Sequence, residues 1–154
     1  MIQSYTNYTD PMTDLLALDR QVCFALAAAS RSVISLYRPV LEPLGLTHPQ
    51  YLVMLALWET SPLRVHELGE RLYLDSATLS PLLKRLEAAG LVVRSRSTDD
   101  ERAVELTLTD AGTALRSKAE AVPPAIIERL GLPISQLEAV RDHLHALIDA
   151  SRRD

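Results

Sequence analysis

The chain has 154 residues and a single cysteine, Cys23. One thiol cannot form an intrachain disulfide, which excludes the disulfide-stapled domains of oxidising compartments. The sequence also lacks a run of about 20 apolar residues, the length that crosses a bilayer. Its first residues, MIQSYTNYTDPMT, have neither the basic nor the apolar region of a signal peptide. We therefore expect a cytoplasmic protein with no membrane partner.

Basic residues are too few to make the whole surface positive. Sixteen Lys and Arg stand against 20 Asp and Glu, a formal net charge of −4. This balance argues against a generic polyanion binder but is compatible with a local basic surface. His66, His143 and His145 have no partners at the spacing of metal ligands. We expect no metal site and no cofactor.

The N-terminal third reads as a loose segment followed by one long helix. Residues 1–13 are polar and have no apolar period, so we expect a flexible N-terminus, and either Asp10 or Thr13 is suited to cap the helix. Apolar residues then recur at steps of three and four from Leu15 to Leu36, and Pro39 predicts an end near Arg38. Such a helix exposes more apolar surface than a small domain needs.

The middle of the chain predicts three further helices. Thr47-His48-Pro49-Gln50 is a capping box, and the apolar helix after it, to Trp58, should be buried. A short helix over 65–72, a three-residue turn and a helix over 76–89 that stops at Gly90 should follow. We expect the aromatic side chains of this region to be core residues: Tyr51, Trp58 and Tyr73.

The apolar period then changes to that of strands. Residues 91–96 and 103–108 predict a β-hairpin whose tip is the polar segment SRSTDDER. Thr109 or Asp110 should cap a helix to about Ala121, which Pro123-Pro124 disturbs. A last helix should open at the pair Ser135 and Glu138.

Helix, tight turn, helix and β-hairpin is the order of a winged helix-turn-helix. The second helix, SATLSPLLKRLEAAG, places leucines on one face and short or basic residues on the other, although Pro81 could distort or delay its first turn. The alternative is an ordinary small α+β domain with a polar helix face. The residues we expect to reach bases and phosphates are Ser76, Thr78, Ser80, Lys84, Arg85, Arg94 and Arg96.

Three segments resemble one known family: HPQYLVMLALWE, LGERLYLDSATLSPLLKRLEAAGLVVRSRSTDDERAVELTLTDAG and the stretch around Cys23. Over roughly residues 15–150 the chain resembles the MarR family, and within it the organic hydroperoxide resistance regulators. The resemblance implies a homodimeric repressor, not an enzyme. Its recognition helices would enter adjacent major grooves of double-stranded operator DNA, an inverted repeat, and its wings would reach the flanking minor grooves.

The family's Asp-x-Arg wing signature falls on Asp100 and Arg102. We expect Asp100 to orient the Arg102 guanidinium through a charge-assisted pair, and an arginine suits the negative potential of a narrow minor groove. The alternative is a solvated hairpin salt bridge of little energetic worth.

Two interpretations of Cys23 follow from the residues: core packing, or a peroxide sensor that is oxidised to sulfenic acid. Cys23 and Tyr37 are about 40° apart around a helix but roughly 21 Å apart along it, so they cannot touch within one chain. In a two-fold antiparallel helix pair centred near Ser30, Cys23 of one chain would lie level with Tyr37 of the other.

The resemblance implies the same pair, with the sensing cysteine at Cys23 and a partner tyrosine at Tyr37. A second tyrosine of some members falls on Ala27, and of others on His48, which either donates in its place or is simply a solvent-exposed helix residue. Lacking a second cysteine, the chain resembles the one-cysteine type, in which a low-molecular-weight thiol captures the sulfenic acid or the cysteine is overoxidised.

The expected fold is mostly α with a small β-hairpin wing, an α+β winged helix-turn-helix with N- and C-terminal dimerisation helices. Residues 14–46 and 113–154 should form the helical dimerisation region, and residues 47–112 the DNA-binding domain. The expected function is a repressor that an organic hydroperoxide induces to leave its operator. The alternatives are a MarR-type repressor that responds to a small aromatic ligand and, less favoured, a cysteine thiol peroxidase.

Overall fold

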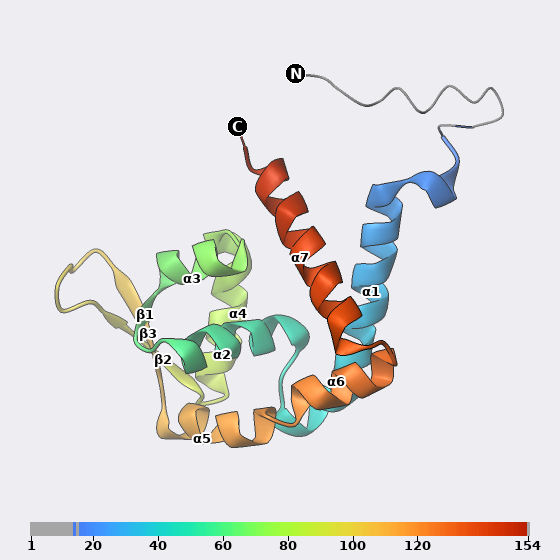
Figure 1. Cartoon of the computed structure of the whole chain (residues 1–154). Coiled ribbons are helices and arrows are strands. Elements are labelled where there is room, and N and C mark those ends of the chain that lie inside the picture. Colours follow the sequence, from blue (N-terminus) through green and yellow to red (C-terminus); the bar gives the residue numbers. More distant parts are fainter. Residues whose placement is uncertain (1–13, 15, 154) are drawn as a thin grey trace. The chain divides into compact units, whose positions relative to one another are not determined.

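The computed structural model describes residue 14 and residues 16–153 (Figure 1). The expected flexible segment 1–13, with the proposed cap at Asp10 or Thr13, lies outside these residues. In chain order the elements are η1 (Leu18–Arg20), α1 (Val22–Leu41), η2 (Glu42–Leu44), α2 (His48–Glu59), β1 (Leu63–Arg64), α3 (Val65–Leu72), α4 (Ser76–Ala88), β2 (Val92–Arg96), β3 (Val104–Leu108), α5 (Asp110–Ala119), α6 (Val122–Leu130) and α7 (Ile134–Ser151).

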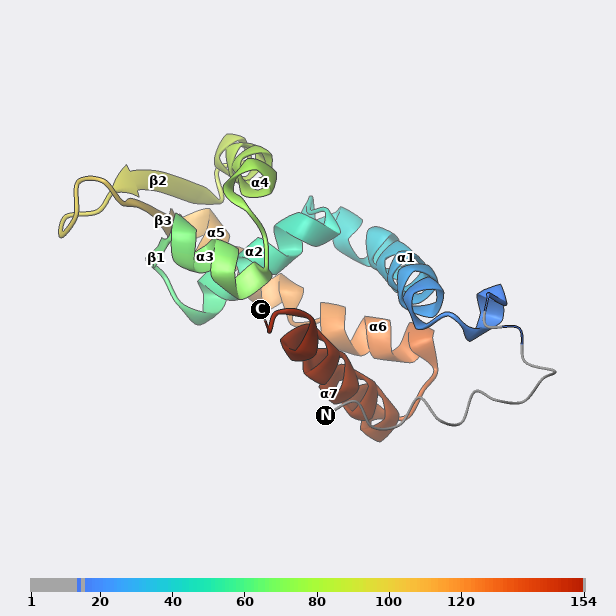
Figure 2. The same cartoon turned by 90° about the horizontal axis from the view of Figure 1, so that it is seen from above.

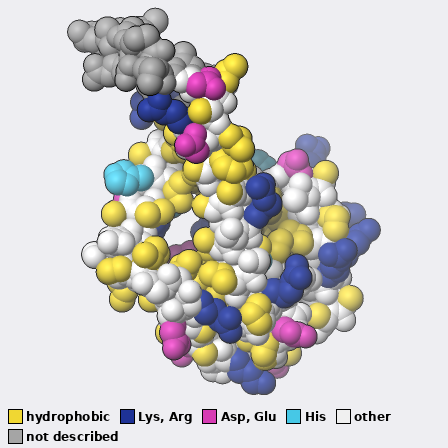
Figure 3. All heavy atoms as spheres, turned by 90° about the vertical axis from the view of Figure 1, so that its right-hand side faces the viewer, with side chains coloured by type: hydrophobic (Ala, Val, Ile, Leu, Met, Phe, Trp, Pro, Cys, Tyr) yellow, Lys and Arg dark blue, Asp and Glu magenta, His cyan; other side chains and the backbone are white. Residues whose placement is uncertain are grey.

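The chain divides into two compact units, one ending at Ser35 and the other beginning at Leu36. In the described part of the first unit, apolar side chains remain exposed, among them Leu16, Val22 and Phe24. Exposed hydrophobic side chains are also visible on the face of the chain in Figure 3. An apolar helix without a cover within its own unit is typical of a segment that packs against another chain.

The core of the second unit forms around α2, which is apolar on nearly all sides. Val53, Met54 and Leu57 of α2 are fully buried, as the sequence predicts. At the start of α2, the Thr47 backbone N–H donates to Gln50 Oε1 at 2.9 Å, the contact that the predicted capping box requires. The residues that complete this core are Leu41, Leu46, Tyr51, Ala56, Leu63, Leu68, Leu79, Leu83, Leu86, Val92, Leu106, Ala119, Val122 and Ile126.

The core includes residues from outside the segment expected to bind DNA. Leu41, Ala119 and Val122 belong to the segments assigned to dimerisation, yet they share one core with the winged helix-turn-helix. The boundary between the two compact units lies inside α1, after Ser35. The elements from α2 to β3 therefore share their core with the last turns of α1 and with α5 and α6.

The sheet has three antiparallel strands in the order β1-β3-β2. β2 and β3 form the predicted hairpin, with Val92 opposite Leu108 and Arg96 opposite Val104, and Figure 2 shows it extending beyond the helices beside it. The sequence prediction missed β1, where Leu63 pairs with Leu106. Two residues are too short for an alternating pattern, so only the pairing with β3 reveals the strand.

Two proline positions differ from their predictions. α1 begins at Val22, later than expected, and continues through Pro39 to Leu41. Proline removes only its own N–H, the donor to the carbonyl of Ser35, so the helix loses one hydrogen bond and still continues for two residues. Pro123 does more than disturb α5, because it lies in the first turn of a separate helix, α6, where the missing N–H has no helical acceptor.

The last helix also begins differently from the prediction. Ser135 is inside α7, which starts at Ile134 after Pro133 as N-cap, so the expected capping box of Ser135 and Glu138 is not formed. Several apolar side chains of α7 are exposed, including Ile134, Val140 and Leu147. In the part of the chain that the structure describes, no helix is long and apolar enough to cross a membrane.

Candidate nucleic-acid interface and reactive cysteine

The helix expected to read DNA, α4, begins as the sequence predicts. Tyr73 turns the chain with a left-handed φ of 56°, and the Asp75 carboxylate accepts a hydrogen bond of 2.7 Å from the Thr78 backbone N–H. This cap lowers the pKa of Asp75 and satisfies one of the free N–H groups of the first turn. Pro81 neither delays the helix nor ends it.

The two faces of α4 differ in burial, as the sequence predicts. Leu79, Leu83 and Leu86 are fully buried, and Leu82 packs partly against the same core. The opposite face leaves Ser76, Thr78, Lys84 and Arg85 exposed, with Ser80 half-buried. The core thus holds the helix in place while short hydroxyls and two cations face solvent.

Arg94 is not the free cation that the sequence suggested. Its Nε donates to Glu87 Oε2 at 2.7 Å, its Nη2 lies 2.7 Å from the same oxygen, and its backbone N–H donates to Glu87 Oε1 at 3.2 Å. The Arg94 guanidinium holds the pKa of Glu87 below its ordinary value. The pair joins α4 to β2, and it neutralises the charge of Arg94, which was expected to contact phosphate. Arg96, by contrast, is exposed and has no ion-pair partner within residues 16–153.

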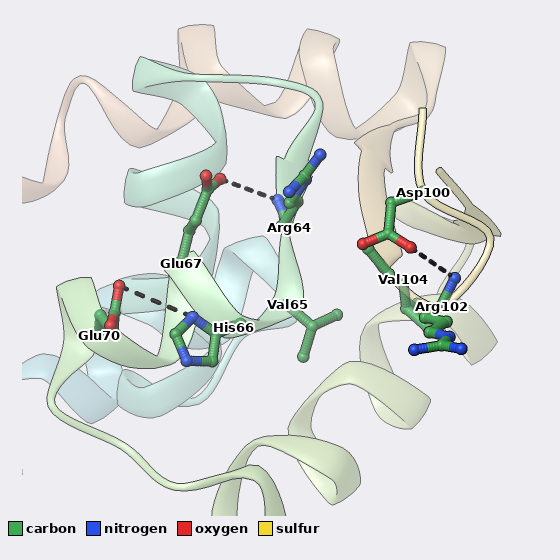
Figure 4. A pocket seen from close by; sticks show the side chains of 9 residues that line it. Arg64, Val65, His66, Glu67, Glu70, Asp100, Arg102 and Val104 are labelled. Atoms are coloured by element: carbon green, nitrogen blue, oxygen red, sulfur yellow. Dashed lines mark hydrogen bonds and ion pairs between the residues drawn. The ribbon is translucent and has the colours of Figure 1, made fainter. Parts of the chain in front are cut away.

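The tip of the hairpin corrects the expected role of Asp100. Its carboxylate accepts a hydrogen bond of 3.0 Å from the backbone N–H of Arg102, and not from the guanidinium. Figure 4 shows the guanidinium pointing away from Asp100. Asp100 therefore shapes the backbone of the turn, and the Arg102 guanidinium has no ion-pair partner among the residues that the structure describes.

An open hollow lies between the hairpin and the start of α3, lined among others by Arg64, His66 and Arg102 (Figure 4). Glu70 lies 3.8 Å from His66, and Glu67 accepts a hydrogen bond from the Arg64 backbone N–H at 3.3 Å. Within the described part of the chain, no three His, Cys, Asp or Glu side chains form a group that could hold a metal ion.

Cys23 is exposed and lies in the first turn of α1. Within the single chain it is therefore not the buried filler that one interpretation of the sequence allowed. Tyr37 lies fourteen residues further along the same helix, about 21 Å away at a rise of 1.5 Å per residue. Contact between the thiol and this phenol would require two chains.

The structure does bring Tyr37 and His48 together. Their ring centroids are 4.7 Å apart in an edge-to-face arrangement. Burial raises the pKa of the Tyr37 phenol and lowers the pKa of the His48 imidazole. The phenol therefore keeps its proton and the imidazole is neutral near pH 7. His48 is half-buried, so it is not the solvent-exposed helix residue of the alternative interpretation.

Comparison with known proteins identifies the family of this chain. Residues 46–104 match the MarR family. The organic hydroperoxide resistance transcriptional regulator of Bacillus subtilis is 43% identical over 136 residues, which cover 88% of this chain and 92% of that regulator. The chain belongs to the MarR family.

Solved structures of other proteins share the MarR fold of this chain. The reduced form of AbfR, a Staphylococcus epidermidis protein, is bound to DNA and is 38% identical, with a TM-score of 0.70 over 86% of this chain and 93% of that chain. CouR from Rhodococcus jostii, bound to p-coumaroyl-CoA, is 27% identical, with a TM-score of 0.74 over 86% and 94%. As a MarR family member the chain is a DNA-binding transcriptional regulator, and the thiol peroxidase alternative finds no support.

One contact of this MarR family chain was not expected from its sequence. Tyr73 is 58% exposed, so it is not a core residue. The Arg152 guanidinium lies 4.5 Å from the centroid of its ring, a cation–π distance. This contact joins the end of α7 to the turn before α4. The helical periodicity of the sequence could not predict this contact, because Arg152 follows the last residue of α7.

Proposed function

We propose that this chain is a dimeric repressor that binds operator DNA when reduced and leaves it when an organic hydroperoxide oxidises Cys23. The observation that carries the proposal is the exposure of the lone thiol, Cys23, at the start of α1. The name of the Bacillus subtilis relative, an organic hydroperoxide resistance transcriptional regulator, supports the class of inducer.

Exposed apolar side chains of α1 and α7 support a homodimer formed by residues 14–46 and 113–154. Val22 and Phe24 of α1 and Val140 of α7 are exposed in the single chain. An antiparallel pair of α1 helices would place Cys23 beside Tyr37 of the partner subunit, because the fourteen-residue spacing is then bridged by the two-fold axis. His48, next to Tyr37 in the structure, would complete the thiol's surroundings.

Residues 47–112 would make the DNA contacts. The exposed groups of α4 would enter the major groove, and Arg102, whose guanidinium is free, would enter a flanking minor groove. Arg85 and Arg96 would contact phosphates, while Arg94, paired with Glu87, would hold the wing against α4. Two such domains in a symmetric dimer would read an inverted repeat.

The chemical step is a two-electron oxidation of sulfur by peroxide. The Cys23 thiolate attacks the terminal peroxide oxygen, the O–O bond breaks, and the alkoxide leaves and takes a proton to become the alcohol. A low-molecular-weight thiol then attacks the sulfenic acid, which releases water and forms a mixed disulfide. A second hydroperoxide would instead give the sulfinic acid. Because the overoxidized form of AbfR is bound to DNA, we assign operator release in this chain to the mixed disulfide.

The competing proposal is a ligand-responsive repressor, which the likeness to CouR bound to p-coumaroyl-CoA supports. An operator is first selected by binding the reduced protein to a pool of random duplexes. Wild type and Cys23→Ser are then treated with cumene hydroperoxide plus a small thiol, or with p-coumaroyl-CoA. We expect the wild type to be released by the hydroperoxide and thiol but not by p-coumaroyl-CoA, and to show a mixed disulfide in its mass spectrum. Release of Cys23→Ser by either treatment would favour the ligand-responsive repressor.

A further inference from the structure

Three aromatic rings form a continuous row through the second compact unit. The centroids of Tyr37 and Tyr51 are 6.0 Å apart, and those of Tyr51 and Trp58 are 6.5 Å apart. Tyr51, in the middle, is only 4% exposed. The row therefore leads from the end of α1 along α2, with a buried ring between its two ends.

The row ends in a hydrogen bond to the first turn of α5, which follows directly on the hairpin. The Trp58 indole N–H donates to the Gly112 carbonyl at 2.9 Å, across 54 residues of sequence. Gly112 packs directly against the chain before β2, because a Cβ atom there would overlap the Leu91 carbonyl oxygen. Thr109 completes the junction: its hydroxyl donates to the Gly90 carbonyl at 2.6 Å and accepts from the Gly112 N–H at 3.0 Å.

This junction is where the two DNA-reading elements meet. α4 ends at Ala88, β2 begins at Val92, and β3 ends at Leu108. A shift of the chain around Gly112 would change the direction of the hairpin relative to α4. Trp58 joins this junction by a hydrogen bond to the ring row that begins at Tyr37.

We propose that Trp58 is a positioning residue that couples the surroundings of Tyr37 to the base of the DNA-reading hairpin. A displaced Tyr37 ring must move against Tyr51, which is buried and close-packed, and Tyr51 in turn against Trp58. The indole has a single donor, so a rotated ring loses its bond to Gly112. This coupling rests on the proposed function, in which oxidation of Cys23 disturbs Tyr37 of the partner subunit.

The wild-type protein offers a direct test, because Trp58 is the only tryptophan of the chain. Its emission reports the environment of the indole alone. We expect oxidation of Cys23 to the mixed disulfide, without DNA present, to shift or quench this emission, and the same treatment of Cys23→Ser to leave it unchanged. Wild-type protein that releases its operator with unchanged emission overturns the coupling. Wild-type protein that is oxidised but keeps its operator contradicts the proposed function, and the coupling with it.

A variant provides the second test. Trp58→Phe keeps an aromatic ring but removes the N–H, whereas Leu55→Ala removes an exposed side chain of the same helix outside the row. We expect the reduced Trp58→Phe protein to bind operator within about threefold of wild type, and to be oxidised at the same rate. The factor by which oxidation weakens its binding should fall roughly three- to tenfold, and Leu55→Ala should keep the full factor. A full oxidation response in Trp58→Phe overturns the coupling.

Discussion

Glu87 accepts two hydrogen bonds from Arg94, one from the guanidinium Nε and one from the backbone N–H, and its Oε2 also forms an ion pair with Nη2. Both side chains are about two-thirds buried. The bond from the Arg94 backbone means that Glu87 fixes the path of β2 as well as the arginine side chain. The pair is therefore a connection between α4 and the wing, formed by two residues seven apart in sequence.

Glu87→Gln should weaken this connection, because an amide cannot form the charge-assisted bonds of the carboxylate. We expect the free energy of unfolding to fall by about 1 kcal/mol near pH 7, the range for a hydrogen-bonded pair that is partly screened. Glu120→Gln, in the exposed pair with Arg116, is the matched control and should have almost no effect. Chemical denaturation of the three proteins measures both values.

The effect of Glu87→Gln should also depend on pH. The folded-state pKa of Glu87 is lowered, so its stabilisation is present above the ordinary glutamate pKa of about 4.3 and is lost as the pH falls through the lowered value. The difference between wild type and Glu87→Gln should therefore shrink in strong acid. A difference that does not change with pH would mean that the ion pair contributes nothing beyond packing.

Arg102→Ala should weaken operator binding by about 1–3 kcal/mol, the range for one specific contact. The free guanidinium at the wing tip suits the negative potential of a narrow minor groove, so the loss should depend on the A·T content of the flanks and not on the centre of each half-site. Binding to operators with altered flanks measures this dependence. Equal loss on every flank would leave the wing without a role in sequence recognition.

Lys84→Ala tests the phosphate contacts on α4. If the exposed Lys84 touches only phosphate, its removal should weaken binding to all sequences alike and reduce the slope of log affinity against log salt by about 2, one contact from each subunit. Affinities measured over a series of salt concentrations give the slope. An unchanged slope together with sequence-dependent loss would assign Lys84 to base contacts.

The sequence predicts the elements around the reading helix closely, because their signals are local. The capping box before α2, the turn at Tyr73 and the leucine face of α4 each depend on residues within one or two helical turns. The features that it misses depend on partners far along the chain. β1 exists only through its pairing with β3, and the ring of the exposed Tyr73 contacts Arg152, a residue at the far end of the chain.

Charge partners in the candidate site could not be predicted for a related reason. The sequence shows that Asp100 and Arg102 lie close together, but the backbone of the tip decides that Asp100 accepts from the Arg102 N–H. Likewise, the spacing of Glu87 and Arg94 crosses a helix end and the start of a strand. The hydrophobic periodicity of the sequence does not predict which side chains come into contact across such a turn.

His48→Gln should remove a pH dependence of stability. Burial lowers the pKa of His48 in the folded chain, so the unfolded chain binds more protons as the pH falls below the ordinary histidine pKa of about 6.5. Wild type should therefore lose stability between about pH 7 and pH 5 to a greater extent than His48→Gln. Thermal or chemical unfolding at several pH values measures this difference, and parallel curves would contradict it.

Tyr37→Phe should slow the oxidation of Cys23 by up to about tenfold and leave the dimer intact, because only a hydroxyl that would hydrogen-bond the thiolate is lost. Stopped-flow consumption of hydroperoxide gives the rate, and sedimentation gives the oligomeric state. An unchanged rate in an intact dimer would mean that Tyr37 only packs against His48 and Tyr51 and does not affect the thiol.

The most direct measurement is the operator affinity of one sample of protein taken through a redox cycle. The dissociation constant is determined for the reduced protein, after cumene hydroperoxide and a small thiol, and again after dithiothreitol. We predict that the oxidised wild type binds at least roughly tenfold more weakly, that reduction restores the first value, and that Cys23→Ser keeps one affinity throughout. An oxidised wild type that binds as tightly as the reduced protein, with Cys23 shown to be modified, would contradict the account.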